Sequence, residues 1–334
     1  MLYQQVLEQP EDFDFTIDQL GECTLPSPIE HRTFVDDDER VLFCNEEKKL
    51  MPLLEAGRKL PSYEKAGPRK KIYHNPAWAK VAIVTCGGLC PGLNDVIKGI
   101  VNTLFFDYGV KNIFGIPYGY RGFIPEYEHK LIELTPDAVD KIHSEGGTIL
   151  GSSRGQQSTE EICDAIQRNN ITMLFTVGGD GTLRGSGEIA EELIKRKQSV
   201  SVIGVPKTID NDLSFIGRSF GFETSVYSTA TTLTAAHVEA KGALNGIGLV
   251  KLMGRDSGFI TAYASMANSV VNFCLIPESP FTLDGENGLL KALERRFESG
   301  KDHAVIVVAE GAGQDLFKDL PERRDASGNV LKKD

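Results

Sequence analysis

Three side chains suited to proton transfer lie close together in the chain, at Thr208, Asp210 and Asp212. Neighbouring carboxylates shift each other's pKa, so one can act as a general base while the other orients it or binds through a cation. Because the three residues are spaced by two, an extended backbone would point them to the same side. The alternative is a turn in which the aspartates only cap backbone N–H groups.

A glycine-rich segment, GGDGT at 178–182, follows an apolar run at 172–177 and precedes a helical pattern. Glycines at a strand's end let a ligand approach the backbone closely, and the start of a helix is a favourable anion site. Asp180 would repel a phosphate unless a cation stood between them. We therefore expect phosphate binding together with Mg²⁺, with Asp180 as a metal ligand. A structural glycine turn with a capping aspartate is the alternative.

Basic residues in separate loops complete this chemistry. Lys207 and Arg255 would supply positive charge where a transferred phosphoryl group accumulates negative charge, and Arg154 lies in another glycine-rich loop. Taken singly, each is typical of a solvated or salt-bridged surface. The histidines show neither metal-ligand spacing nor a nucleophile–base pattern.

The elements that position these loops alternate from residue 80 onward. Strands are predicted at 81–84, 112–116, 172–177, 200–205, 247–252, 271–276 and 304–308, with helices between them, among them 224–240 and 289–297. Thr135 before Pro136 predicts a helix start, and Gly146-Gly147 its end. Ser158 with Glu161 forms a capping-box pattern. Alternation of strand and helix predicts an α/β fold with parallel sheets covered on both faces.

Five of these strands end in polar or glycine-rich loops, after Val84, Val177, Val205, Leu252 and Val308. In open α/β sheets, ligands bind outside the carboxyl ends of the strands. We therefore expect the five loops to converge on one crevice.

Composition narrows the class of protein. With 47 acidic against 36 basic residues the net charge is -11, which disfavours nucleic acid or an anionic membrane as a general partner. No run approaches the ~20 apolar residues of a membrane span, and the start does not read as a secretory leader. Six scattered cysteines favour reduced thiols in the cytoplasm. Residues 1–75 lack sustained periodicity and are predicted to form an extension and not a domain. A solvated arm is favoured over an extension that wraps or tethers. A domain boundary is expected near residue 220.

Six segments together resemble the phosphofructokinase family. They are TCGGLCPGLN (85–94), GGTILGSSRG (146–155), GGDGT (178–182), PKTIDND (206–212), MGRDSG (253–258) and VAEG (308–311). They occur in family order and at family spacing over about residues 78 to 311. Lipid kinases and NAD kinases use stretches similar to GGDGT, but they leave the 206–212 and 253–255 loops unexplained.

The resemblance implies a fold of two Rossmann-like three-layer domains with mostly parallel sheets and the active site in the cleft between them. Residues 76–219 would bind the nucleotide and residues 220–334 the sugar phosphate. The expected reaction transfers a phosphoryl group from ATP to the 1-hydroxyl of fructose 6-phosphate, giving fructose 1,6-bisphosphate in glycolysis.

Site residues follow from the matching motifs. Asp210 matches the general base, Asp212 and Asp180 match residues that support the base and hold Mg²⁺, and Thr208 is expected at the sugar's reacting end. Arg255 is expected to stabilise charge in the transition state. Donor-binding positions match Gly88, Tyr120, Arg154, Gly179, Gly181, Thr182, Gly185 and Lys207, and the sugar-phosphate pocket matches Met253, Gly254, Arg255 and Glu310.

The donor is argued from two positions. Relatives that use pyrophosphate carry aspartate at the position of Gly181, where its side chain fills the space of ATP's α-phosphate. Lys207 is common in pyrophosphate users, but branches resembling plant and trypanosomal enzymes combine this glycine with this lysine. ATP is therefore the expected donor and pyrophosphate the alternative.

The resemblance also covers assembly and the chain's length. A homodimer or homotetramer under allosteric control is expected. The family supplies further sugar-phosphate ligands and helices beyond the position of Asp334, so the second domain is expected to be incomplete. A truncated or non-catalytic regulatory paralogue, which binds nucleotide or sugar phosphate without turnover, is the alternative to an active kinase.

Overall fold

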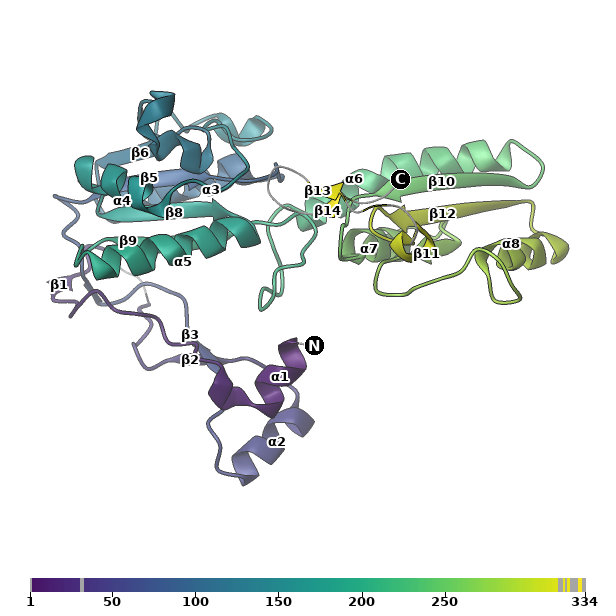
Figure 1. Cartoon of the computed structure of the whole chain (residues 1–334), viewed down its shortest axis with the longest axis horizontal. Coiled ribbons are helices and arrows are strands. Elements are labelled where there is room, and N and C mark those ends of the chain that lie inside the picture. Colours follow the sequence, from purple (N-terminus) through teal and green to yellow (C-terminus); the bar gives the residue numbers. More distant parts are fainter. Residues whose placement is uncertain (1, 31–32, 318–320, 322, 325–329, 332–334) are drawn as a thin grey trace.

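Two mostly parallel β-sheets, each covered by helices on both faces, form most of the molecule (Figure 1). The computed structural model describes residues 2–30, 33–317, 321, 323–324 and 330–331. The α/β fold expected from the alternating pattern is confirmed, and the two sheets lie in separate parts of the chain.

The first domain carries a five-stranded sheet in the order β7-β6-β5-β8-β9. Its elements are β5 (Lys80–Thr85), α3 (Leu93–Asn102), η2 (Thr103–Asp107), β6 (Asn112–Ile116), η3 (Gly119–Phe123), η4 (Pro125–Tyr127), β7 (Ile132–Glu133), η5 (Ile142–Ser144), α4 (Thr159–Arg168), β8 (Met173–Gly178), α5 (Asp180–Lys195) and β9 (Ser201–Pro206). Strands β6, β5, β8 and β9 are parallel, and β7 pairs antiparallel with β6.

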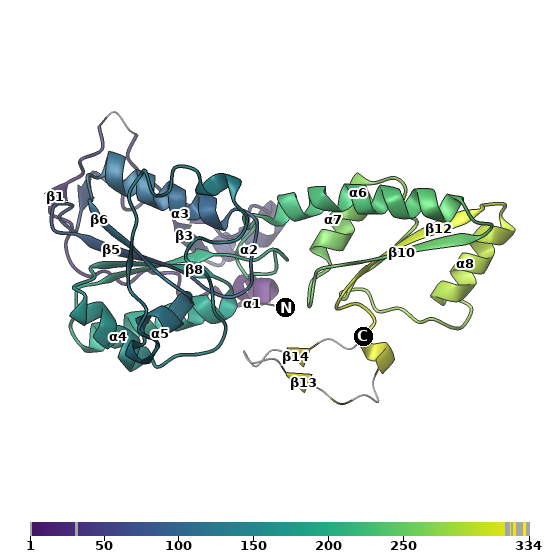
Figure 2. The same ribbon diagram turned by 90° about the horizontal axis from the view of Figure 1, so that it is seen from above.

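Alternate residues of β5 face two separate cores. Val81 and Ile83 pack in the core that includes α3, while Ala82 and Val84 pack in the core that includes α4 and α5. Figure 2 shows these helices on opposite sides of the sheet. An uninterrupted apolar strand is what a sheet buried on both faces requires.

The second domain carries a three-stranded parallel sheet in the order β10-β12-β11. Its elements are α6 (Phe222–Lys241), β10 (Gly246–Leu252), α7 (Phe259–Ala267), β11 (Phe273–Leu275), α8 (Leu289–Glu298), β12 (His303–Ala309), η6 (Gln314–Phe317), β13 (Arg323–Arg324) and β14 (Val330–Leu331). Val305 and Val307 of β12 share a core with residues of α6 and α7, whereas Ala304 and Ile306 share one with Leu293 of α8.

The N-terminal residues form short elements of their own. They are α1 (Leu2–Glu8), η1 (Pro10–Asp12), β1 (Leu25–Pro26), β2 (Arg40–Leu42), α2 (Glu47–Glu55), β3 (Ser62–Glu64) and β4 (Lys71–Ile72). Strands β2 and β3 pair antiparallel, as do β1 and β4. Figure 1 shows α1, α2 and the β2–β3 pair beneath the first domain. Among the described residues, no helix is long and apolar enough to cross a membrane.

The helix predicted from Thr135-Pro136 to Gly146-Gly147 is wrong. Turns occupy this stretch, followed only by the short η5. Side chains of α3 hold its backbone carbonyls: Lys98 Nζ donates to Asp140 O, and Asn94 Nδ2 donates to Glu145 O at 3.1 Å. These bonds replace the carbonyl pairing of a helix. By contrast, Ser158 caps α4 as predicted, accepting a hydrogen bond from the Glu161 amide at 3.2 Å.

Candidate active site

The crevice in the first sheet lies between β5 and β8. From β5 the chain continues to β6 on one side and later returns to β8 on the other side. The loops that leave β5 and β8 therefore diverge, which opens a binding crevice at the carboxyl ends of the two strands. The two glycine-rich segments singled out in the sequence, 85–94 and 178–182, begin at the ends of these two strands.

The GGDGT segment joins β8 directly to α5. Gly179 is the N-cap of α5, and Asp180 is its first residue. A Cβ at Gly178 would collide with the side chain of Thr182, so glycine lets this threonine lie across the turn. A Cβ at Gly181 would meet nothing within 4 Å. The first turn of α5 therefore offers open space beside backbone amides and the positive end of the helix dipole.

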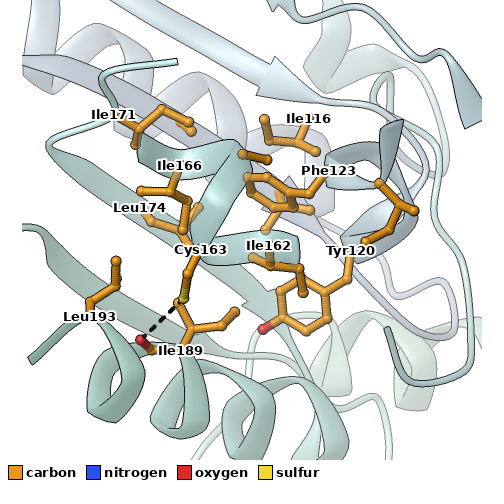
Figure 3. Close-up of a cluster of buried hydrophobic side chains, with 14 of the residues drawn as sticks. Ile116, Tyr120, Phe123, Ile162, Cys163, Ile166, Ile171, Leu174, Ile189 and Leu193 are labelled. Atoms are coloured by element: carbon orange, nitrogen blue, oxygen red, sulfur yellow. Dashed lines mark hydrogen bonds between the residues drawn. The ribbon is translucent and has the colours of Figure 1, made fainter. Parts of the chain in front are cut away.

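Tyr120 and Gly185, two of the predicted donor-binding residues, pack beside the GGDGT turn, which contains a third, Thr182. The Tyr120 hydroxyl donates to Thr182 O at 2.8 Å, and both side chains are buried. A Cβ at Gly185 would lie 3.0 Å from the Tyr120 ring, so the glycine allows close packing there. Figure 3 shows Tyr120 within the core beside Ile162. These three residues support the start of α5, and direct contact with a nucleotide stays a prediction for them.

Lys207 connects the loops that follow β5, β8 and β9. Its Nζ donates to Gly88 O at 2.7 Å, and its amide donates to Gly178 O at 2.9 Å. The side chain is only 7% exposed, and burial lowers its pKa. Arg154 lies beside the same loop, because a Cβ at Gly88 would be 3.4 Å from a guanidinium nitrogen of Arg154. Two cationic side chains thus flank the glycine loop after β5.

The 206–212 loop is a turn and not an extended segment. Asn211 has a φ of 55°, in the left-handed region, so the expected alternation of side chains along an extended backbone is wrong. The Thr208 hydroxyl donates to Asp212 Oδ1 at 2.5 Å and accepts from the Asp210 amide at 3.2 Å. The side chains of Thr208 and Asp212 nevertheless contact each other across the turn. Thr208 also caps the backbone amide of Asp210, so the capping alternative holds in part.

The Asp210 carboxyl takes no part in this capping. Within the described part of the chain, its Oδ1 is buried and has no hydrogen-bond partner. Burial and then the neighbouring Asp212 carboxylate raise the pKa of Asp210 to about 6, against the opposing effect of a backbone hydrogen bond from Arg255. A partly buried carboxyl with a raised pKa is suited to accept a proton near neutral pH.

Asp180 belongs to the same electrostatic cluster. Burial and the Asp212 carboxylate raise the pKa of Asp180, and Arg184 opposes this. Asp212 thus acts on both Asp180 and Asp210, which places the GGDGT turn and the 206–212 loop within electrostatic reach of each other. The described residues contain no group of three or more side chains that could hold a metal ion. Since Mg²⁺ usually takes one or two protein carboxylates with water and phosphate, its binding at Asp180 stays a prediction.

The loops after β10 and β12 lie against each other. Glu310 N donates to Leu252 O at 2.9 Å, and Gly311 N donates to Gly254 O at 3.0 Å. Gly254 has a φ of 130°, which favours glycine, and a Cβ at Gly311 would collide with the Arg255 carbonyl. The close approach sets Arg255 Nε 3.9 Å from Glu310 Oε1.

The two domains meet at Asp210. Ser257 Oγ donates to Asp210 O at 3.0 Å and thereby joins the loop after β10 to the loop after β9. With Lys207 bonded to Gly88 and Gly178, and Glu310 beside Arg255, contacts link all five loops. That the loops enclose one binding crevice stays a prediction. Met253 lies in the same loop as Arg255, and its side chain is half exposed.

Comparison with protein-family models identifies the family of the chain. The family model described as "Phosphofructokinase" matches residues 80–333. The chain belongs to the phosphofructokinase family.

Curated phosphofructokinases match most of the chain. It is 50% identical over 335 residues to the ATP-dependent 6-phosphofructokinase of Borreliella burgdorferi, covering 97% of this chain and 74% of that protein. It is 52% identical over 274 residues to ATP-dependent 6-phosphofructokinase 7 of Arabidopsis thaliana, covering 81% of this chain and 56% of that protein. The chain thus spans between about half and three quarters of the length of these two relatives.

Solved phosphofructokinase structures share the fold. The Pichia pastoris enzyme in the T-state aligns with a TM-score of 0.63 at 23% identity, covering 81% of this chain and 32% of that one. A pyrophosphate-dependent phosphofructokinase from Marinobacter aquaeolei aligns with a TM-score of 0.61 at 24% identity, covering 70% and 61%. At these identities the likeness concerns the fold alone.

Two polar residues of this candidate site were not singled out from the sequence. Ser219 is buried, and its hydroxyl accepts the Thr208 amide at 3.1 Å while donating to Thr208 O. Ser257 makes the bond to Asp210 described above. Both are small hydroxyl residues next to glycine or aromatic residues in loops, a signal too common to distinguish them from other loop serines.

Proposed function

We propose that this chain provides the catalytic machinery of an ATP-dependent 6-phosphofructokinase, which phosphorylates fructose 6-phosphate at its 1-hydroxyl. The observation that carries the proposal is the buried, unpartnered Oδ1 of Asp210, between the GGDGT turn and the Arg255 loop. The identity to ATP-dependent 6-phosphofructokinases supports the donor and the acceptor.

Asp210 is the proposed general base. Its ionised carboxylate accepts the proton of the 1-hydroxyl as that oxygen bonds to the γ-phosphorus. The bond from the γ-phosphorus to the bridging oxygen breaks at the same time, and ADP leaves with the electron pair. The Thr208 hydroxyl donates a hydrogen bond to the Asp212 carboxylate and accepts one from the Asp210 amide. These two bonds fix the loop around the base.

Cationic groups are proposed to bind and stabilise the phosphates. Lys207 and Arg154 flank the glycine loop after β5, and the amides of Gly179, Asp180 and Gly181 begin α5. Asp180 is the residue that would hold Mg²⁺, which when bound neutralises charge on the phosphate oxygens. Arg255, from the second domain, would stabilise the charge that develops during transfer.

The sugar phosphate is assigned to the loops of the second domain. Met253, Gly254, Arg255 and Glu310 lie on two adjoining loops at the carboxyl ends of β10 and β12, where ligands of parallel sheets bind. We assign residues 76–219 to the donor and residues 220–334 to the sugar phosphate. A homodimer or homotetramer, allosteric control and a cytoplasmic location complete the proposal; the six cysteines, all unpaired, are compatible with a reducing compartment.

A coupled assay tests this function, with fructose 6-phosphate as acceptor and either ATP or pyrophosphate as donor. We expect fructose 1,6-bisphosphate to form with ATP. Turnover only with pyrophosphate would favour the donor suggested by Lys207. Tight ATP binding without turnover by either donor would support the non-catalytic alternative.

A further inference from the structure

An aromatic cluster links the N-terminal residues to the loop that carries Asp210. Phe215 lies in this loop, three residues after Asp212. Its ring centroid is 5.8 Å from that of Phe15 and 5.7 Å from that of Phe43, both in edge-on arrangements. We call residues 2–75 the N-terminal arm. Figure 1 shows the segment between β9 and α6 descending toward this arm.

The arm's side of the cluster is built from distant positions. Phe15 lies 4.9 Å from Tyr63 of β3 and 6.0 Å from Phe43, and Phe43 lies 4.8 Å from Tyr3 of α1. Tilted and edge-to-face pairs at these distances are the favourable geometry for aromatic rings. Aromatic residues from four segments of the arm thus form one cluster. Two of its members, Phe15 and Phe43, pack against the ring of Phe215.

Phe215 is held in a conformation that its own backbone does not favour. Its φ is 68°, in the left-handed region, which is unusual for a bulky residue. The side chain remains 42% exposed, so core burial is not what retains it. The two ring contacts with the arm are interactions that favour this position of the side chain.

Hydrogen bonds tie the segment that contains Phe215 to the turn at Thr208. Asn211 Oδ1 accepts the Ser219 amide at 2.8 Å, and Asn211 Nδ2 donates to Gly217 O at 3.3 Å. Ser219 Oγ accepts the Thr208 amide and donates to the Thr208 carbonyl. The ends of the 211–219 segment, in which Phe215 lies, are thus tied to each other and to Thr208.

The arm itself is anchored to the first domain. His74 Nε2 lies 2.9 Å from Ser201 Oγ at the start of β9, the strand that leads into the catalytic turn. The arm therefore contacts β9, which precedes the 206–212 loop, and also Phe215, which follows that loop.

We infer that Phe215 is a positioning residue, through which the N-terminal arm holds the 206–219 loop in the geometry needed for phosphoryl transfer. This inference rests on the proposed function for its kinetic consequence, but not for its structural one. It gives the arm a role in the reaction without any contact between the arm and a substrate.

The test compares Phe215→Ala, Phe15→Ala and the double variant with wild type in the full chain. Phe106→Ala is the matched control, because Phe106 is a 66% exposed aromatic residue of η2 whose ring pairs with Phe105. Steady-state kinetics with ATP and fructose 6-phosphate are combined with hydrogen exchange of the peptides covering 206–219 and 173–185.

We expect each single variant to lower kcat about tenfold while the KM for ATP changes less than about twofold, since the GGDGT turn is held by the sheet. The double variant should be no worse than Phe215→Ala, because that variant already removes the contact between Phe215 and Phe15. Exchange in 206–219 should quicken about tenfold with 173–185 unchanged. Phe215→Tyr should retain wild-type values, as should Phe106→Ala.

Wild-type kcat and wild-type exchange of 206–219 in Phe215→Ala would overturn the inference. Multiplicative losses in the double variant would do the same. If Phe215→Ala fails to fold, Phe15→Ala carries the same expectation with an intact loop sequence. If wild type shows no turnover, the proposed function fails, while the exchange comparison still decides whether the arm holds the loop.

Discussion

Ser257 Oγ donates a hydrogen bond of 3.0 Å to the backbone carbonyl of Asp210. This bond crosses from the second domain to the loop that carries the proposed base. Ser257 is almost fully buried, so water has little access to this bond. If the bond were lost, water could not easily replace it as the partner of the Asp210 carbonyl. The position of the base therefore depends on the second domain as well as on the first.

Removing this bond should impair the reaction more than it impairs folding. Ser257→Ala is expected to lower kcat/KM for fructose 6-phosphate about tenfold, the equivalent of one lost hydrogen bond at ~1–1.5 kcal/mol. Ser265→Ala is the matched control, since Ser265 donates to Thr261 O within α7 and contacts no loop of the site in its hydrogen bonding. Equal activities of the two variants would contradict the positioning role.

The pH dependence should report Asp210. Burial raises its pKa from 3.8 to about 6, and a general base acts only when ionised, so kcat/KM should rise as the pH increases through about 6. Stability should change in the opposite sense. A raised folded-state pKa contributes stability that is present below pH 4 and is lost as the pH rises through about 6. Rate profiles with melting temperatures at each pH check both, and a flat rate between pH 5 and 7 in folded protein would refute the assignment.

Gly181→Asp should impair the use of ATP without destabilising the fold. A Cβ at Gly181 meets nothing within 4 Å, and aspartate in the first turn of α5 suits the helix dipole, so melting temperature should not fall. The KM for ATP should rise at least about tenfold, because a carboxylate would repel and obstruct the α-phosphate. Gly187→Asp is the control: it lies in open space on the same helix, away from the turn. Unchanged ATP kinetics in Gly181→Asp would contradict the site.

Sequence patterns sufficed where the cause of structure is local. The apolar run of β5, the capping box at Ser158 and the strand that ends in Gly178 all follow from residues adjacent in the chain. The convergence of loops was also predictable, because parallel strands direct their carboxyl ends to one edge.

Sequence patterns failed where side chains distant in the chain determine the conformation of the backbone. Lys98 and Asn94 of α3 hold carbonyls of the 135–147 stretch, and no signal inside that stretch reveals them. The left-handed Asn211 bends the 206–212 loop, and its side chain accepts a hydrogen bond from Ser219, eight residues away. Phe15 and Phe215 meet only through the fold, so the role of the N-terminal arm had no sequence signature.

The most direct test of the central claim is a single-turnover measurement on Asp210→Asn with ATP and fructose 6-phosphate. The variant keeps the shape of the side chain and removes the proton acceptor, so the transfer rate should fall by about 10²–10⁴. ATP binding should stay within about twofold, and the melting temperature should rise, because a buried ionised carboxylate is replaced by a neutral amide. A transfer rate equal to that of wild type would contradict Asp210 as the base.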